Sequence, residues 1–507
     1  MEYVLGIDIG TSGTKTVLFR TDGVPVSSAT YEYPLHTPKN GYAEQEPADW
    51  YNAVISGIRD VIGKSTVSAA EIKGIGLSGQ MHGLVMLDGD NKVLRRAIIW
   101  CDQRTAAEAD EITRRVGHEK LITVTANPAI TSFTAAKLLW VRNNEPEIYE
   151  KCRHVLLPKD YIRFTLTSEY ATEVSDASGT QLLDVPNRCW SDEVLRLLEI
   201  DKALLPGVYE SPELTGKITK QTAELTGLAV GTPVVGGAGD NAAAAVGTGV
   251  VENGKAFTTI GSSGVVFAHT SKVLIDKGGR VHTFCCAVPN EWHVMGVTQS
   301  AGMSLKWFRD NFCQCEMQAA ALAGIDTYQL TDKAAASVPI GAEKLLFLPH
   351  LNGERTPHLD PNARGVFFGL SAMHTKKHLL RAIMEGVAFS MRDCVEIIRS
   401  MGINVSDMMA CGGGGTSQFW RQMLADLYSC SVKTTLNKEG PALGVALLAA
   451  VSVGVYKSVP EACKAVIKSE KTEHLISENV PKYEKVYELY KKLYPVMSQS
   501  FKELSEL

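Results

Sequence analysis

The chain has 507 residues, of which 45% are hydrophobic and 21% are charged, and its formal net charge is −5 at pH 7. This length exceeds what one hydrophobic core organises, so we expect at least two globular domains. A slightly acidic chain without a long Lys/Arg run excludes a general electrostatic attraction to nucleic acid or to an anionic membrane. The eleven cysteines show no Cys-x-x-Cys spacing, which argues against a zinc ribbon or a thioredoxin-like redox site.

The sequence also predicts where the chain works in the cell. Its first residues, MEYVLGIDIG, lack the basic region, apolar core and cleavage site of a secretory signal. The most apolar later run, Pro441–Tyr456, is too short to cross a bilayer and predicts a buried helix. A large chain with unpaired thiols is typical of a reducing compartment, so we expect a cytoplasmic location.

Two apolar runs near the N-terminus, Tyr3–Ile9 and Thr14–Phe19, predict strands joined by a glycine-rich turn at Gly10–Gly13. Successive backbone N–H groups in such a turn can cradle a phosphate. Thr11, Ser12 and Thr14 add hydroxyl groups, and Lys15 adds positive charge. Asp8, at the end of the first strand, can hold Mg²⁺ directly or through water. The alternative is an ordinary hairpin, because glycine is common in hairpin turns.

Two later stretches carry candidate ligand-binding residues. Gly79–Gly83 reads GQMHG and places His82 on a loop between predicted strands. A turn histidine without a role is an equal alternative for His82. Trp100–Arg104 reads WCDQR and sets an aromatic face beside a carboxylate and an arginine, which suits a polyol or sugar. It equally fits the start of a helix over Gln103–Arg115 that is capped by Asp102.

The stretch Pro233–Gly249, reading PVVGGAGDNAAAAVGTG, lies near the middle of the chain, where two halves would meet. Its short apolar run, its glycines and its four alanines predict a strand, a sharp turn and a helix, with Asp240 at the turn. A carboxylate at such a turn is a candidate catalytic group. The alternative is that Asp240 only caps the helix, which aspartate does well.

The second half repeats the pattern of the first turn. In Ala256–Phe267, reading AFTTIGSSGVVF, one apolar run enters Gly261–Gly264 and another leaves it. Gly10–Gly13 and Gly261–Gly264 therefore share a Gly-hydroxyl-hydroxyl-Gly pattern between strands, about half a chain apart. We predict two similar domains that face each other, each offering a hairpin loop to one polyphosphate.

Three further segments of the second half have distinct patterns. Asp407–Cys411 predicts a strand that runs into four glycines, Gly412–Gly415, before a helix, and such a turn lets a flat or anionic ligand approach the backbone. A loose turn is the alternative, but four ordered glycines carry a large entropy cost, so we favour binding. Leu351–Pro361, reading LNGERTPHLDP, is polar and predicts a loop. Tyr483–Leu504 predicts one terminal helix packed on its own domain, with a partner-binding helix as the alternative.

Together, GIDIGTSGTK, GGAGDNAAAAVG, IGSSG and CGGGGTSQFW resemble the FGGY carbohydrate kinases, which belong to the superfamily of actin, hexokinase and the large heat-shock chaperones. The stretches at Ser132–Asn144 and Gly365–Gly386 match signatures of the same family, and the resemblance covers nearly the whole chain. It implies an α/β fold of two ribonuclease-H-like domains that close over ATP and a sugar. The N-terminal domain would comprise residues 1–247 and the C-terminal domain residues 248–507.

The resemblance also implies roles for individual residues. Asp240 would be the general base, and Asp8 would be a second catalytic residue that orders the Mg²⁺ shell. The sugar-binding residues would be Met81, His82, Trp100, Asp240 and Asn241. The nucleotide-binding residues would be Gly10, Thr11, Ser12, Gly13, Thr14, Lys15, Gly261, Ser262, Ser263, Gly302, Gly412, Gly413, Gly414 and Ser417. Ser262 departs from the threonine that is usual in the family, and the retained hydroxyl predicts little effect.

Within the family, GQMHG, WCDQR, LLPKDYIRF and LNGERTPH resemble the members that act on D-xylulose. The resemblance thus implies Mg²⁺-dependent transfer of the γ-phosphoryl group of ATP to the C5 hydroxyl of this pentulose. Ribulose, gluconate and a polyol such as erythritol stay open as acceptors. An ATP-gated chaperone or a filament subunit is the non-enzymatic alternative. A homodimer is a further hypothesis about partners, and no residue pattern bears on it.

Overall fold

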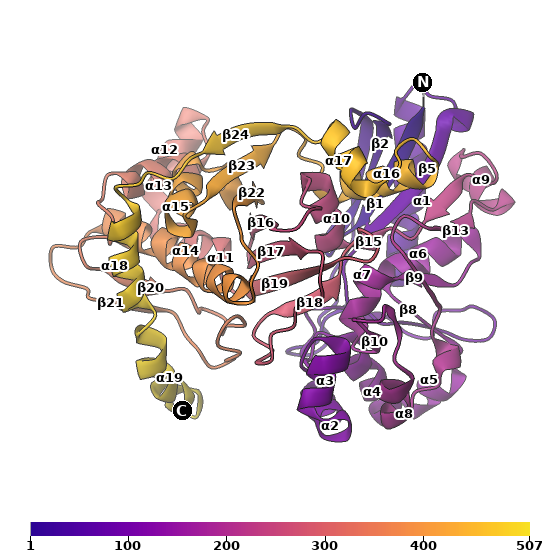
Figure 1. Ribbon diagram of the computed structural model, residues 1–507, viewed down its shortest axis with the longest axis horizontal. Coiled ribbons are helices and arrows are strands. Elements are labelled where there is room, and N and C mark those ends of the chain that lie inside the picture. Colours follow the sequence, from indigo (N-terminus) through magenta and orange to yellow (C-terminus); the bar gives the residue numbers. More distant parts are fainter. Residues whose placement is uncertain (1) are drawn as a thin grey trace.

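The first half of the chain is organised by a seven-stranded sheet in the order β13-β14-β5-β1-β2-β3, in which β15 also pairs with β5. The computed structural model describes residues 2–507. The strands are β1 (Tyr3–Ile9), β2 (Gly13–Arg20), β3 (Pro25–Glu32), β5 (Ile72–Gly79), β13 (Leu214–Lys217), β14 (Pro233–Val235) and β15 (Ala238–Gly239). This sheet and the helices around it form one lobe in Figure 1, the N-terminal lobe.

A second seven-stranded sheet, in the order β18-β19-β17-β16-β22-β23-β24, organises the other lobe, the C-terminal lobe (Figure 1). Its strands are β16 (Lys255–Ile260), β17 (Gly264–Thr270), β18 (His282–Cys285), β19 (Trp292–Thr298), β22 (Asp407–Cys411), β23 (Ser431–Thr435) and β24 (Ser469–Glu473).

The two sheets share one topology. Each has a central antiparallel hairpin, β1–β2 or β16–β17, whose first strand also pairs in parallel with β5 or β22. Each ends on one side with an antiparallel edge strand, β13 on β14 or β24 on β23. The predicted α/β fold of two ribonuclease-H-like domains is therefore confirmed.

Short strands and nineteen α-helices complete the described part of the chain. The short strands are β4 (Glu44–Gln45), β6 (Val85–Leu87), β7 (Ala97–Ile98), β8 (His154–Leu156), β9 (Ala171–Glu173), β10 (Leu183–Asp184), β11 (Cys189–Trp190), β12 (Gly207–Tyr209), β20 (Leu346–Leu348) and β21 (Val366–Phe368). The helices of the first half are α1 (Pro47–Lys64), α2 (Ala106–Val116), α3 (His118–Thr125), α4 (Thr134–Asn144), α5 (Pro146–Lys151), α6 (Pro158–Thr167), α7 (Val174–Ala177), α8 (Asp192–Leu198), α9 (Lys220–Thr226) and α10 (Asp240–Thr248). Those of the second half are α11 (Gly302–Phe312), α12 (Gln314–Ala323), α13 (Thr327–Ala336), α14 (Lys376–Ser400), α15 (Gln418–Tyr428), α16 (Gly440–Ser452), α17 (Val459–Val466), α18 (Val480–Tyr490) and α19 (Leu493–Ser505).

Helix α16 follows the strands of the C-terminal lobe but packs on the sheet of the N-terminal lobe, beside β1 and β5 (Figure 1). It approaches the sheet closely because glycines face it. A Cβ atom on Gly6 of β1 would lie 2.0 Å from the carbonyl oxygen of Ala442, and one on Gly76 of β5 would lie 2.0 Å from that of Val445. The buried helix predicted at Pro441–Tyr456 is present and ends at Ser452. Nowhere in residues 2–507 is a helix both long and apolar enough to cross a membrane.

Helix α16 also crosses α10, the helix that begins with Asp240, and glycines again set the distance. A Cβ atom on Gly444 would lie 1.9 Å from the carbonyl oxygen of Ala243, and one on Gly247 would lie 1.9 Å from that of Gly440. The crossing fastens α10 to a helix that belongs to the other half of the sequence. A division of the chain into domains after residue 247 stays a prediction.

The single helix predicted over Tyr483–Leu504 is wrong. The structure has two helices, α18 and α19, with a break at Lys491 and Lys492. Pro495 lies in the first turn of α19 and has no N–H to donate to the carbonyl of Lys491, so one continuous helix would lose that hydrogen bond. The tyrosines of α18 are buried and surround Phe389 of α14, which places the segment on its own lobe.

The glycine crossing makes a prediction for stability. Gly444→Ala places a methyl group against the carbonyl of Ala243 and should lower the free energy of unfolding by about 1–3 kcal/mol, the usual cost of overpacking. The matched control is Gly63→Ala in α1, where nothing lies within 4 Å of the added carbon. A helical Gly→Ala change at an open position should be neutral or stabilising. Thermal unfolding measures both variants, and equal midpoints for them would contradict the close crossing.

Candidate active site

Asp240 is the first residue of α10, and it lines a cavity of about 660 Å³ between the two lobes. Its Oδ1 accepts hydrogen bonds from the backbone N of Asn241 at 2.7 Å and from the Nδ2 of Asn241 at 2.9 Å. The N-cap position belongs to Gly239, so Asp240 is not the N-cap residue of α10, and its carboxylate accepts only one backbone N–H of the first turn, that of the next residue. Burial and the charge of Asp8 raise the pKa of Asp240 to about 7, against the hydrogen bonds from Asn241. A carboxylate with such a pKa is suited to accept a proton at neutral pH.

Asp8 stands at the end of β1, where the β1–β2 ladder places it opposite Lys15. Its Oδ1 is buried and has no hydrogen-bond partner among the described residues. Burial raises the pKa of Asp8. A buried carboxylate oxygen without a donor suits a hard cation.

Asp8 fits a magnesium ion that takes its other ligands from elsewhere. Across residues 2–507, no group of three or more His, Cys, Asp or Glu side chains is arranged to hold a metal. Mg²⁺ commonly binds to one or two carboxylates and completes its shell with water and substrate phosphates. The donor set around Asp8 therefore fits an ion that arrives with a nucleotide.

The first glycine turn joins β1 to β2, and its backbone is ordered. The N–H of Gly10 donates to the carbonyl of Gly13 at 3.0 Å. The indole Nε1 of Trp100 donates to the hydroxyl of Thr11 at 2.9 Å, and Ser12 is exposed at the tip of the turn. Trp100 itself is 39% exposed, which leaves part of its ring free beside the turn.

Two residues after this turn have other partners. Thr14 is buried, and its hydroxyl donates to the phenolic oxygen of Tyr33 at 3.4 Å. The Nζ of Lys15 forms an ion pair at 2.5 Å with Glu439, the residue that precedes α16. Lys15 would have to exchange this partner before it could bind a phosphate.

The second glycine turn resembles the first in sequence but is one residue shorter. The N–H of Gly261 donates to the carbonyl of Ser263 at 3.0 Å. In the β16–β17 ladder Ile260 pairs with Gly264, whereas in β1–β2 Ile9 pairs with Thr14. Gly264 therefore pairs across its hairpin, whereas Gly13, although it begins β2, has no partner in β1.

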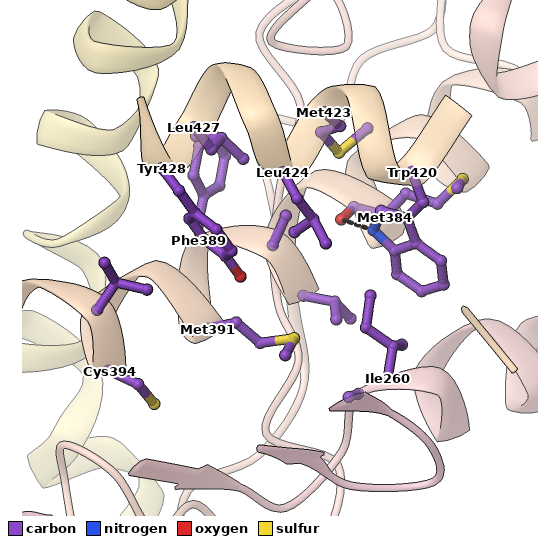
Figure 2. Close-up of a cluster of buried hydrophobic side chains, with 14 of the residues drawn as sticks. Ile260, Met384, Phe389, Met391, Cys394, Trp420, Met423, Leu424, Leu427 and Tyr428 are labelled. Atoms are coloured by element: carbon purple, nitrogen blue, oxygen red, sulfur yellow. Dashed lines mark hydrogen bonds between the residues drawn. The ribbon is translucent and has the colours of Figure 1, made fainter. Parts of the chain in front are cut away.

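A second cavity, of about 630 Å³, lies in the C-terminal lobe and brings together six of the predicted nucleotide-binding residues. They are Gly261, Ser262, Gly302, Gly413, Gly414 and Ser417. Ile260 and Trp420 also line it, and Figure 2 shows both side chains at the edge of the hydrophobic core between β16, α14 and α15. The indole Nε1 of Trp420 donates to the carbonyl of Met384 at 3.1 Å, which holds the ring in place. Such a cavity suits a flat aromatic base.

The glycine run connects the two cavities. Gly412 and Gly413 line the cavity at Asp240, and Gly413 also lines the second cavity. Gly412 has a φ of +74°, and a Cβ atom there would lie 2.8 Å from the carbonyl oxygen of Ile260. The N–H of Gly415 donates to the carbonyl of Gly412 at 3.1 Å, so the run is an ordered turn and not a loose one.

The loop after β5 carries Met81 and His82, and Met81 reaches the turn that carries Asp240. The Nδ1 of His82 lies 2.8 Å from the carbonyl of Gly179, so Nδ1 carries the hydrogen and Nε2 keeps its lone pair. Burial and the charge of Lys137 lower the pKa of His82 to about 3, so the ring is neutral. Met81 is buried against Gly239, where a Cβ atom would lie 3.0 Å from its sulfur. Met81 thus connects the His82 loop to the turn that carries Asp240.

The interpretation of Asp102 as a helix cap is wrong. Helix α2 begins at Ala106 with Thr105 at its N-cap, three residues later than predicted. Asp102 is fully buried, and its Oδ2 accepts hydrogen bonds from the backbone N of Ala43 at 2.6 Å and from Arg104 Nη2 at 2.7 Å. The carboxylate of Asp102 is thus neutralised by Arg104 and fixed to the backbone at Ala43, so the pair supports the structure of the loop.

Lys137 of α4 is a functional candidate that the sequence reasoning missed. It is fully buried, and its Nζ donates to the carbonyl of His82 at 2.7 Å and to that of Ser132 at 2.6 Å. Burial lowers the pKa of Lys137 to about 7. Lys137 therefore holds the backbone of His82, and no carboxylate within residues 2–507 forms an ion pair with it. A lysine inside the apolar run of Thr134–Asn144 is the signal that points to it.

A pair of glutamines, also missed, links the His82 loop to the first glycine turn. The Nε2 of Gln80 donates to the Oε1 of Gln45 at 2.7 Å, and the Nε2 of Gln45 donates to the carbonyl of Thr11 at 2.7 Å. Both side chains are buried. The two loops are thereby held in one arrangement, as a site for two substrates requires.

The comparisons with known proteins identify the family of the chain. Residues 3–247 match the N-terminal domain of the FGGY family of carbohydrate kinases, and residues 256–453 match its C-terminal domain. The chain belongs to the FGGY family of carbohydrate kinases. Membership of this kinase family implies ATP as the phosphoryl donor and a carbohydrate as the acceptor.

Three FGGY relatives illustrate the similarity. Xylulose kinase of Bacillus subtilis (strain 168) is 39% identical over 494 residues, 97% of each chain. Gluconokinase of the same strain is 30% identical over 506 residues, 99% of this chain and 98% of the relative. The crystal structure of ligand-bound xylulose kinase from Lactobacillus acidophilus has a TM-score of 0.92 at 26% identity, covering 99% of this chain and 100% of that one.

The electrostatic coupling of the two carboxylates makes a prediction for the pH profile. Asp8→Asn removes a negative charge that raises the pKa of Asp240, so that pKa should fall. If Asp240 is the general base, it acts when deprotonated, and the rate should fall below about pH 7 in the parent. In Asp8→Asn this acid limb of the pH–rate profile should move to lower pH. The rate at limiting concentrations of both substrates reports the free enzyme and measures the shift. Asp192→Asn, whose side chain is 78% exposed, removes the same charge at the surface and should leave the limb in place. If the acid limb of the pH–rate profile stays in place in Asp8→Asn, the charge of Asp8 does not raise the pKa of Asp240.

Proposed function

We propose that the chain phosphorylates D-xylulose at its C5 hydroxyl with ATP, giving D-xylulose 5-phosphate and ADP. The observation that carries the proposal is Asp240, a carboxylate with a pKa of about 7 in a cavity between the lobes, beside the His82 loop. The 39% identity to xylulose kinase of Bacillus subtilis, over nearly the whole of both chains, supports the choice of sugar.

In the proposed reaction Asp240 accepts the proton of the C5 hydroxyl as that oxygen attacks the γ-phosphorus of ATP. The bond from the γ-phosphorus to the bridging oxygen breaks, and ADP leaves with that electron pair. General base catalysis contributes about 10²–10⁴ in rate. The larger part of the acceleration should come from in-line positioning and from neutralising the phosphate charge.

The two glycine turns, Gly10–Gly13 and Gly261–Ser263, would donate backbone N–H groups to the phosphates. The bordering residues of the nucleotide site would be Gly302, Gly412, Gly413, Gly414 and Ser417. Asp8 would hold Mg²⁺ through its unpartnered Oδ1. When bound, the ion would neutralise charge on the phosphate oxygens.

The sugar would lie along the loop of Met81 and His82, with Asn241 beside its reacting end. The Nε2 of His82 would accept a hydrogen bond from a sugar hydroxyl, since its Nδ1 donates to Gly179. The exposed part of the Trp100 ring would cover the sugar from the side of the first glycine turn. A homodimer stays a hypothesis.

Gluconate is the second candidate acceptor. The gluconokinase of Bacillus subtilis aligns over 99% of this chain, at 30% identity, which is lower than the identity to the xylulose kinase. Both acceptors would use the same base and the same phosphate loops. D-Xylulose and gluconate would differ at the end of the molecule remote from Asp240.

A panel of acceptors at saturating Mg·ATP tests the proposal. The highest kcat/KM should belong to D-xylulose, above ribulose, gluconate and erythritol, and a higher value for another acceptor would overturn the choice of sugar.

Asp240→Asn should fold and bind ADP but lose at least about 10² of turnover, because the proton acceptor is gone. Turnover within about tenfold of the parent would remove Asp240 as the base. The control Asp192→Asn should match the parent.

The metal site is tested separately. Chelation of divalent ions should abolish turnover, and Asp8→Asn should raise the Mg²⁺ concentration that gives half of the maximal rate, since it removes the proposed ligand. Rates measured over a series of free Mg²⁺ concentrations give this value. An unchanged Mg²⁺ requirement in Asp8→Asn would move the ion to other ligands.

A further inference from the structure

Arg355 lies in the loop Leu351–Pro361 of the C-terminal lobe, a segment to which the proposed function assigns no role. Glu354 holds this loop in place through hydrogen bonds to its carboxylate. It is 3% exposed, and its carboxylate accepts hydrogen bonds from the backbone N of Gln299 at 2.8 Å and from the Nδ1 of His350 at 3.0 Å. The backbone N of Arg355 donates to the same carboxylate at 2.8 Å. The base of the Arg355 side chain is therefore held in place.

The guanidinium of Arg355 reaches across to the N-terminal lobe. Its Nη2 lies 3.4 Å from the hydroxyl of Ser132, which is its one hydrogen bond to a residue in the range 2–507. Within the same range it forms no ion pair, because the carboxylate of Glu354 is turned to backbone and histidine donors. Burial lowers the pKa of Arg355 but leaves the group charged at neutral pH. Arg355 is half-buried, so the N–H donors of its guanidinium that do not reach Ser132 are open to water or to a ligand.

The neighbours of Arg355 belong to the proposed sugar site. Ser132 precedes Phe133, whose ring centroid lies 4.8 Å from that of His82. The carbonyls of Ser132 and His82 accept from the same Nζ of Lys137. The charge of Arg355 also contributes to the lowered pKa of His82. The guanidinium therefore lies beside the His82 loop, although it comes from the opposite lobe.

The arrangement gives the site two distinct ends. Met81 packs against Gly239, next to Asp240, and His82 follows on the side of Phe133. The charge of Asp8 acts on Asp240, and that of Arg355 acts on His82. A sugar with its reacting hydroxyl on Asp240 that runs along His82 would bring its other end to Arg355.

We propose that Arg355 is a sugar-binding residue from the C-terminal lobe, which donates hydrogen bonds to the C2 carbonyl and the C1 hydroxyl of the pentulose. This inference rests on the proposed function, because it takes the orientation of the sugar from Asp240. A guanidinium presents several N–H donors in one plane, which match a carbonyl with a neighbouring hydroxyl. Both lobes would then hold one sugar, so that sugar binding favours the closed arrangement of the lobes.

The test is Arg355→Met, which keeps much of the side-chain length and removes every donor. The KM for D-xylulose should rise at least tenfold, while the KM for ATP stays within twofold. The preference for D-xylulose over xylitol, which lacks the carbonyl, should shrink at least tenfold in kcat/KM. Arg355→Lys keeps the charge without the planar fork and should lie between the parent and Arg355→Met. Arg364→Met is the matched control, because its guanidinium donates to the backbone carbonyls of Pro361 and Ala363, and it should leave both KM values in place.

The outcomes separate this inference from the proposed function. A sugar KM within twofold of the parent in folded Arg355→Met, or equal increases in the KM values for sugar and ATP, would overturn the role of Arg355. If the parent itself prefers another acceptor, the proposed function fails, and the same variants are assayed on that acceptor. If Arg355→Met does not fold, the KM split in Arg355→Lys decides between sugar binding and a structural role. Calorimetric titration of D-xylulose into the parent and the variant measures binding without turnover, and an unchanged Kd would also overturn the inference.

Discussion

The crossing of α10 and α16 is the contact on which the rest of the site depends. Both helices carry a glycine where they meet, so the backbones approach to a distance that excludes any side chain. Asp240 is the first residue of α10, and the position of that helix sets the position of the carboxylate. Helix α16 in turn lies on β1 and β5, which end at Asp8 and at the His82 loop. Asp240, Asp8 and the His82 loop are therefore all built on one packed layer.

Burial then decides the charge of the groups that this layer brings together. It moves the pKa of Asp240 up to about 7, that of Lys137 down to about 7 and that of His82 down to about 3. Each shift favours the neutral form, which suits the recognition of an uncharged sugar through hydrogen bonds. The carboxylate of Asp240 gains its affinity for a proton near neutral pH from burial and from the charge of Asp8. Arg355 is the exception, since its guanidinium keeps its charge and meets few acceptors in the protein.

The two lobes share one topology without being equivalent. The turn between β16 and β17 is one residue shorter than the turn between β1 and β2, although both read Gly-hydroxyl-hydroxyl-Gly. The cavity with an apolar side at Trp420 and Ile260 lies in the C-terminal lobe, and the His82 loop lies in the other. In the proposed function the adenine would bind to the C-terminal lobe and the sugar mainly to the N-terminal lobe. The Arg355 loop of the C-terminal lobe reaches Ser132 of the other lobe, beside the His82 loop.

The sequence by itself determined the features that depend on near neighbours along the chain. The strands at Tyr3–Ile9 and Asp407–Cys411, the turn at Asp240 and the four-glycine turn followed from apolar runs and from the backbone freedom of glycine. The sequence motifs were enough to indicate the family. Only the tertiary structure decided that α16 covers the sheet of the other lobe, that Asp102 accepts from the backbone N of Ala43, and that Arg355 reaches Ser132. These depend on contacts between residues far apart in sequence, which no local pattern records. The same reason holds for the pKa of Asp240, because burial and the charge of Asp8 act through space.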